Sequence, residues 1–185
     1  MTRLPITALC AFTASLGIAY AATQWTMEPR QSSITFVGTQ AGAKFEGVFE
    51  KFTADIRFDP KDLATSRFDV QIDTTSVNTK DGERDDIIRG ADLFATKQHP
   101  TARYVAEKFT DTGAGKFAAN GQLTLRGVSR AVPIAFTFEP GQGGHWLKGT
   151  ATLRRLDFGV GQGEWKDTET VANEVQIRFA LLLKS

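Results

Sequence analysis

The segment from Gly121 to Phe138 alternates apolar and polar residues in both of its halves, with a turn signal between them. The apolar positions are Leu123 and Leu125 in the first half, and Val132, Ile134, Phe136 and Phe138 in the second. Because successive side chains of a β-strand point to opposite faces of a sheet, each half predicts a strand with one apolar face. The break at Gly127 to Ser129 predicts a β-hairpin whose apolar face lies against a core or a cavity.

The same alternation recurs along most of the chain and predicts an all-β fold. We expect a loop from Gly38 to Ala43, and a bend or bulge at Gly47 within an unusually long apolar run. The eight predicted strands begin near Ser32 and continue with residues 44–58, 68–73, 101–109, 116–126, 130–138, 146–158 and 171–183. Antiparallel strands in simple succession remove their exposed edges by closing on themselves, so we predict an eight-stranded antiparallel β-barrel.

One segment departs from the two-residue period and predicts a short helical insertion near residues 81–98. Asp81 is placed to cap a helix, and the acidic residues that follow it suit the positive end of a helix. Gly90 divides the segment and Pro100 ends it. The apolar side of one short helix, or of two, would come from Ile87, Ile88, Leu93 and Phe94.

The first 21 residues read as a secretory signal peptide, with Arg3 ahead of an apolar run and a small-x-small cleavage site ending at Ala21. We therefore expect a periplasmic protein with one domain over residues 22–185. Its only cysteine, Cys10, would be lost with the signal, which excludes disulfides and thiol chemistry. The remaining acidic and basic residues balance, so nothing in the composition indicates a nucleic-acid partner.

Several short motifs resemble, in order and spacing, those of the YceI-like family. They are Ser76-x-x-Thr79, Arg84-Asp85, Leu93-Phe94, His99-Pro100, Gly121-x-Leu123-Thr124-Leu125-x-Gly127-Val128-Ser129 and Arg155-x-Asp157-Phe158-Gly159. The resemblance implies a periplasmic, lipocalin-like barrel whose elongated hydrophobic pore binds a polyisoprenoid or a similar long-chain amphiphile. It implies no enzymatic activity.

Two stretches depart from the commonest pattern of the family. Many members have a histidine after the first strand, whereas this chain reads Gly38-Thr39-Gln40-Ala41-Gly42. Residues 40–47 and 161–165 are more similar to a branch associated with membrane cytochromes of the b561 type. That similarity makes a quinone ligand or a cytochrome partner worth testing.

An apolar barrel interior is open to two interpretations, because alternation does not distinguish a hollow barrel from a filled one. An eight-stranded barrel is wide enough for one slender ligand, but this leaves both forms open. Because the resemblance to the YceI-like family implies a ligand-binding pore, we take the hollow form as the leading hypothesis. The side chains predicted to line the pore lie at alternate positions of their strands, on the apolar face: Phe36, Phe45, Phe49, Ile56, Phe68, Val70, Ile72, Leu123, Leu125, Ile134, Phe136, Leu153, Val175, Ile177 and Phe179.

Arg155 shares the parity of Leu153, so we also expect it to point inward. Its planar guanidinium could hold a phosphate or a quinone oxygen at the mouth of the barrel. The alternative, which we favour, is a structural ion pair with Asp157 or with the Arg84-Asp85 turn.

Other kinds of site find little support in the sequence. The spacing of the carboxylates after Asp81 does not fit a calcium loop, and His99 and His145 lie far apart with no cysteine nearby. Gly159-x-Gly161-x-Gly163 lacks the helix of a nucleotide-binding fingerprint, and no nucleophile elbow is present. We expect no metal, no cofactor and no catalytic residue.

The apolar barrel, together with what the family resemblance implies, leads us to expect a carrier for an isoprenoid lipid, a quinone or a fatty amide. The alternative is an accessory protein with a filled barrel that docks a membrane cytochrome. The oligomeric state stays open, with a homodimer among the options.

Overall fold

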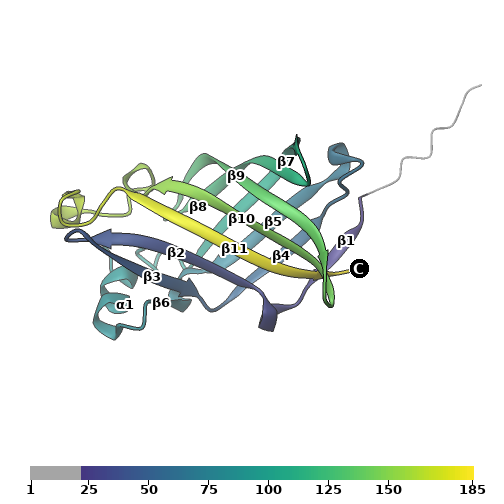
Figure 1. The fold of residues 1–185 in the computed structure, drawn as a ribbon. Helices are drawn as coiled ribbons and strands as arrows, with labels where there is room; N and C mark the ends of the chain where they lie inside the picture. The colour runs from purple at the N-terminus through teal and green to yellow at the C-terminus, as the bar shows by residue number, and fades with distance from the viewer. Residues whose placement is uncertain (1–21) are drawn as a thin grey trace, which may run out of the picture.

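In the computed structural model, residues 22–185 form one elongated barrel with a short helix at one end (Figure 1). The predicted signal peptide, residues 1–21, lies outside the described residues. The helix is α1 (Gly82–Arg89), and the strands are β1 (Gln24–Met27), β2 (Ser33–Gln40), β3 (Ala43–Phe49), β4 (Phe52–Arg57), β5 (Arg67–Asp73), β6 (Val77–Asn78), β7 (Thr101–Gly113), β8 (Lys116–Leu125), β9 (Val128–Gly141), β10 (Gly144–Arg154) and β11 (Glu174–Lys184).

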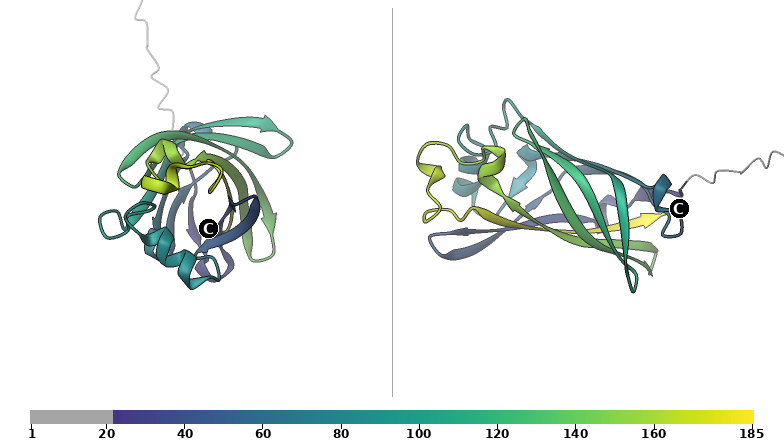
Figure 2. Two further views of the ribbon diagram at one scale, coloured as in Figure 1. Left: turned by 90° about the vertical axis from the view of Figure 1, so that its left-hand side faces the viewer. Right: turned by 90° about the horizontal axis from the view of Figure 1, so that it is seen from above.

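Eight antiparallel strands close the barrel, as the alternation predicts. They follow the order β1-β4-β5-β7-β8-β9-β10-β11, and the pairing of β11 with β1 completes the ring. Seen along its axis, the barrel carries α1 and the 159–173 loop on one rim, and the C-terminus lies at the opposite end (Figure 2). We call these the helix end and the closed end. Among the described residues, no helix is long and apolar enough to cross a membrane.

Three strands of the ring are extended toward the helix end by a second strand that follows a short break. β2 extends β1, β3 extends β4, and β6 extends β5. The break between β3 and β4 falls at Glu50 and Lys51, beside the turn at Thr74–Ser76. The Ser76 carbonyl accepts from the Glu50 amide (3.1 Å), and its hydroxyl oxygen accepts from the Lys51 amide (3.0 Å). These bonds join the β3–β4 break to the β5–β6 break, so the two bent strands stay paired across the bend.

The predicted bend at Gly47 is therefore wrong in its position. Gly47 pairs regularly with Phe36 across β2 and β3, and a Cβ there would lie 2.3 Å from the Phe36 ring. Gly121 on β8 likewise leaves room for the ring of Tyr104. In both places glycine lets an inward aromatic ring lie over the neighbouring strand.

Two tight turns also differ from the predicted loops. β8 and β9 are joined by Arg126 and Gly127 alone, so Ser129 already belongs to a strand. The predicted Gly38–Ala43 loop is in fact strand up to Gln40, followed by a turn at Ala41 and Gly42. All four turn residues have positive φ, which is the backbone that matches the twist of two-residue hairpins.

Aromatic side chains fill the closed end of the barrel. Phe58 is fully buried, and its ring lies within 5.0–5.8 Å, centroid to centroid, of five others: Phe68, Phe109, Phe117, Phe136 and Phe138. The indole of Trp25 donates to the Phe58 carbonyl (2.9 Å) and packs edge-on against Phe138. We call Trp25, Phe58, Phe109, Phe117, Phe136 and Phe138 the aromatic floor.

The helical insertion forms one α-helix that begins as predicted. Asp81 caps α1 by accepting from the Arg84 amide (3.1 Å), and Gly90 follows its last residue. Leu93 and Phe94 lie in turns after the helix rather than in a second helix.

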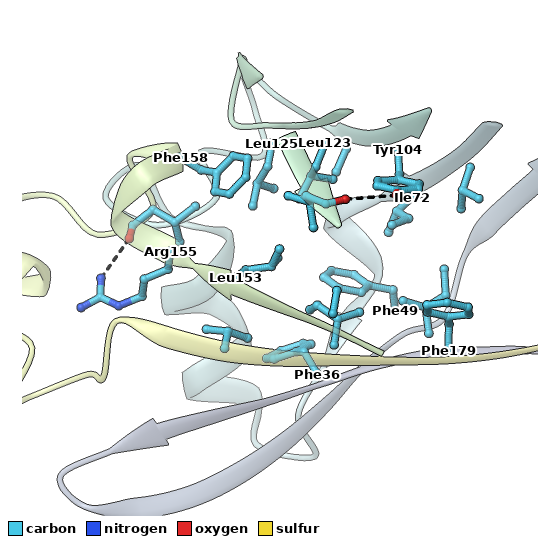
Figure 3. Close-up of a pocket in the computed structure, with 18 of the residues that line it drawn as sticks. Phe36, Phe49, Ile72, Tyr104, Leu123, Leu125, Leu153, Arg155, Phe158 and Phe179 are labelled. Atoms are coloured by element: carbon cyan, nitrogen blue, oxygen red, sulfur yellow. Dashed lines mark hydrogen bonds between the residues drawn. The ribbon is translucent and has the colours of Figure 1, made fainter. Parts of the chain in front are cut away.

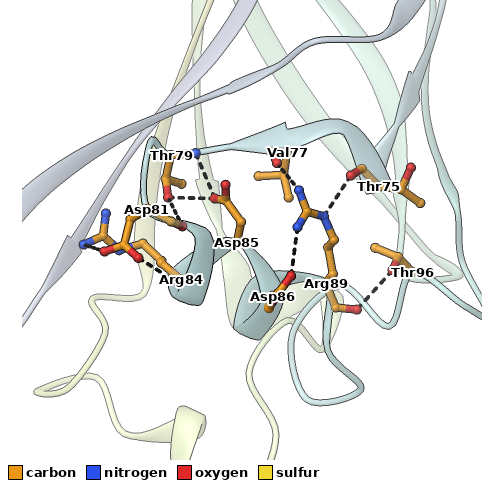
Figure 4. Close-up of polar contacts among 9 residues, drawn as sticks. All are labelled: Thr75, Val77, Thr79, Asp81, Arg84, Asp85, Asp86, Arg89 and Thr96. Atoms are coloured by element: carbon orange, nitrogen blue, oxygen red, sulfur yellow. Dashed lines mark hydrogen bonds and ion pairs between the residues drawn. The ribbon is translucent and has the colours of Figure 1, made fainter.

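Side-chain hydrogen bonds hold α1 against β6 (Figure 4). The Arg89 guanidinium donates to the carbonyls of Thr75 (2.9 Å) and Val77 (2.7 Å). Buried Asp85 accepts from both the amide (2.8 Å) and the hydroxyl (2.7 Å) of Thr79. Among the strands of residues 22–185, β6 pairs only with β3, and α1 packs beside the other edge of β6.

Candidate functional site

Between the aromatic floor and the helix end, the barrel encloses an apolar cavity of about 200 Å³ (Figure 3). Strand side chains form most of its wall, and Ile88, Leu93 and Phe94 complete the wall beneath α1. An engineered apolar cavity of about 150 Å³ stays dry and binds benzene, so a cavity of this size can hold an apolar ligand. The barrel is thus filled at one end and hollow over the rest.

Fourteen of the fifteen apolar side chains predicted to line the pore lie on this wall. They are Phe36, Phe45, Phe49, Ile56, Phe68, Val70, Ile72, Leu123, Leu125, Ile134, Leu153, Val175, Ile177 and Phe179. The exception is Phe136, which faces inward but belongs to the aromatic floor, where it is 3% exposed. The alternation predicts which face of a strand a residue lies on, but not its position along the barrel axis. Phe136 lies so close to the closed end that it packs in the floor and does not line the cavity.

Exposure along β11 shows where the cavity lies. The inward side chains Val175, Ile177 and Phe179 are only partly buried, whereas Leu181 and Leu183 further along the same face are fully buried. Leu181 still lines the cavity, and Leu183 does not. The hollow part of the barrel therefore runs from the helix end to about the level of Leu181.

Several wall residues were missing from the prediction. Ile34, Val132, Leu147, Ala151 and Leu181 share the inward parity of their strands, so the alternation contained that signal. Tyr104, Ala102 and Gly38 are also inward strand positions, whereas Phe158, Val160 and Val171 belong to turns that fold over the helix end. No strand period could have found this last group.

Of the described wall residues, only Tyr104 and Arg155 carry polar side-chain atoms. The Tyr104 hydroxyl donates to the Val132 carbonyl (3.1 Å), and burial raises the pKa of this phenol to about 12. Within residues 22–185, no buried side-chain nitrogen or oxygen lacks a hydrogen-bond partner. The cavity thus presents an apolar surface without a free polar group.

Arg155 is 5% exposed, and its guanidinium points away from the cavity (Figure 3). It donates to the carbonyls of Val160 (2.9 Å), Val171 (2.6 Å) and Ala172 (3.1 Å). Burial lowers the pKa of the guanidinium. Both predicted ion pairs are wrong, because Asp157 lies nearest Arg154 and Asp85 binds Thr79. The strand ladder ends at Arg154, so parity no longer governs the direction of Arg155.

The guanidinium of Arg155 instead organises the 159–173 loop over the helix end. Gly161 lies so close that a Cβ there would overlap the guanidinium. The loop reaches the β2–β3 turn through the Ala41 amide and the Thr170 carbonyl (2.9 Å), and the α1 segment through the Gly161 amide and the Asp92 carbonyl (2.9 Å). Three segments distant in sequence thus meet around one end of the cavity.

A family model for the YceI-like domain matches residues 25–183 of this chain. The chain belongs to the YceI-like family. Polar residues of the motifs that carry the resemblance build the frame of the barrel: Ser76 bridges the bent strands, Thr79 and Asp85 fix α1, and the Arg155 guanidinium holds the 159–173 loop. Apolar residues of the same motifs line the cavity: Leu93, Phe94, Leu123, Leu125 and Phe158. The proposed b561-associated branch stays a prediction.

Relatives and solved structures agree with this membership. A UPF0312 protein of Vibrio parahaemolyticus is 32% identical over 148 residues, which is 75% of this chain and 78% of that protein. The crystal structure of Burkholderia cenocepacia BcnA, a similar YceI-like barrel, has a TM-score of 0.82 at 33% identity, covering 86% of this chain and 99% of that one.

A polyisoprenoid-binding domain from Saccharophagus degradans shares the fold at lower sequence similarity. Its TM-score is 0.70 at 16% identity, and the match covers 87% of this chain and 98% of that domain. The fold of this YceI-like chain is therefore one on which an isoprenoid-binding protein is also built.

Proposed function

We propose that this YceI-like protein is a periplasmic carrier that shields the tail of an isoprenoid lipid or a similar long-chain amphiphile from water. The observation that carries the proposal is the apolar cavity whose polar neighbours are all hydrogen-bonded within the protein. Burial of a hydrocarbon contributes about 0.8 kcal/mol per methylene, so even a short tail gains enough to offset part of the cost of association.

The apolar wall also favours one orientation of the ligand. A quinone ring or a phosphate buried against this wall would lose its hydrogen bonds with water and find no free donor in exchange, which costs free energy. The tail therefore enters first, and the head group stays at the helix end, where the wall side chains Phe45, Leu125 and Val175 are only partly buried. Isoprenoid lipids, quinones and fatty amides all fit this arrangement.

A neighbouring pair of residues on β10 gives a direct test. Ala151 faces the cavity and Thr152 faces solvent. Ala151→Phe should place a ring in the cavity and abolish lipid binding, whereas Thr152→Phe should leave binding unchanged. Each protein is exported from a bacterial host, purified without detergent and examined by native mass spectrometry, followed by solvent extraction of the bound material.

A stoichiometric lipid on the wild type and on Thr152→Phe, but not on Ala151→Phe, supports the carrier. A wild type that stays free of ligand after incubation with prenols and quinones contradicts it. The same export experiment tests the predicted signal peptide, because cleavage after Ala21 would give the mass of a mature chain that begins at Ala22. Binding to a membrane cytochrome and formation of a homodimer stay predictions.

A further inference from the structure

The cavity ends abruptly on the inward face of β9. Ile134 lines the wall, and Phe136, two residues further along the same face, does not. The ring of Phe136 lies 5.3 Å, centroid to centroid, from that of Phe68, which is a wall residue, and 5.4 Å from that of Phe58 in the aromatic floor. Phe136 therefore lies at the boundary between the bottom of the cavity and the aromatic floor, and its ring contacts residues of both.

The side chains around Phe136 leave its ring no room to move aside. Phe117 stacks against it at 5.6 Å, Phe109 meets it edge-on at 6.3 Å, and Phe58 meets it edge-on at 5.4 Å. Phe136, Phe117 and Phe58 are all less than 5% exposed. Because a close-packed interior of this kind resists local expansion, an entering tail cannot push the floor downward.

From this arrangement we propose that Phe136 determines specificity by setting the greatest tail length that the cavity can bury. The inference rests on the proposed carrier function. Each methylene that reaches the wall should raise affinity about fourfold, whereas a carbon that the floor excludes stays at the helix end and adds little. Affinity should therefore climb with tail length and then reach a plateau.

Phe136→Ala should move that plateau. The lost ring leaves a space close to the size of one isoprene unit next to the existing cavity, so the plateau should shift by about one unit. Phe138→Ala is the matched control, since this inward residue of the same strand packs its ring against Trp25, Phe58 and His145, none of which lines the cavity. Phe136→Leu provides a milder change if the alanine variant does not fold.

The experiment titrates the delipidated proteins with a homologous series of prenyl alcohols, from geraniol through farnesol and geranylgeraniol to solanesol, by isothermal calorimetry. We expect the first alcohol beyond the wild-type plateau to bind Phe136→Ala roughly tenfold or more tightly than it binds the wild type. The length profile of Phe138→Ala should match that of the wild type.

Three results would overturn the inference. Affinity that rises through the whole series in the wild type shows that the floor sets no limit, although the carrier function stands. A plateau that does not move in Phe136→Ala, or that moves equally in Phe138→Ala, removes Phe136 as the determinant. Failure of the wild type to bind any prenol in this series, and any quinone in the export experiment, contradicts the proposed function, and the inference falls with it.

Discussion

Replacing Arg155 with methionine should destabilise the protein through the loop at the helix end. The side chain is buried, and three of its hydrogen bonds to loop carbonyls measure 2.6–3.1 Å. Arg155→Met keeps the apolar stem of the side chain and removes every donor. The carbonyls of Val160, Val171 and Ala172 then lose the hydrogen-bond donor that they share.

The magnitude follows from two opposing contributions. An acceptor left without its hydrogen bond costs about 1–3 kcal/mol, so three of them cost roughly 3–9 kcal/mol if the loop does not move. Two effects offset part of this cost. The loop lies at the surface and can open to hydrate its carbonyls. Methionine also abolishes the penalty for burying a cation that has no carboxylate partner within residues 22–185. We expect a net loss of about 2–4 kcal/mol in the free energy of unfolding.

Urea denaturation measures this loss, and hydrogen exchange of the amides in residues 159–173 shows whether the loop carries it. Arg154→Met is the matched control, because Arg154 is exposed and lies 4.0 Å from Asp157 in a surface pair. The control should change stability by less than about 0.5 kcal/mol. An Arg155→Met protein as stable as the control, with the amides of the loop equally protected, would refute the assigned role.

Two further predictions concern packing and pH. Gly121→Ala should cost about 1–3 kcal/mol in thermal or urea unfolding, because its Cβ would lie 2.3 Å from the buried Tyr104 ring. Gly82→Ala, whose Cβ would point into open space at the start of α1, should not destabilise the protein, and equal losses in the two variants would contradict the packing argument. Hydrogen bonds from Arg103, and from Arg67, lower the pKa of Asp69 from 3.8 to about 2. The stabilisation by this carboxylate is thus complete above its unfolded pKa and disappears as the pH falls through about 2. The wild type should therefore lose about 1 kcal/mol more than Asp69→Asn on acidification from pH 5 to pH 2, and parallel acid profiles would exclude the effect.

Much of the fold and of the cavity wall follows from the two-residue period alone. The period fixes which face of a strand is inward, so Phe36 on β2, Phe68 on β5 and Ile177 on β11 reach the wall as predicted. The same rule fails where the ladder stops: Arg155 follows the last paired residue of β10, and its direction depends on carbonyls from a distant loop.

The remaining differences arise from contacts between segments far apart in the sequence. The break at Glu50 and Lys51 is held by Ser76, which is distant in the sequence and which no local pattern identifies. Gly47, the glycine that the local pattern singled out, instead leaves room for the Phe36 ring of β2. Phe136 shows the limit of the period most clearly. Its inward face is predictable, but its place in the floor depends on how the other strands stack their aromatic rings at the same level.

The contacts between α1 and β6 also bear on how the protein avoids aggregation. A strand with a free edge is a template on which another chain can add a strand. Here Arg89 donates to the Val77 carbonyl, and Asp85 accepts from the Thr79 amide, so one helix supplies both the donor and the acceptor that a neighbouring strand would offer. The docked helix therefore occupies the backbone groups through which another chain could add a strand beside β6.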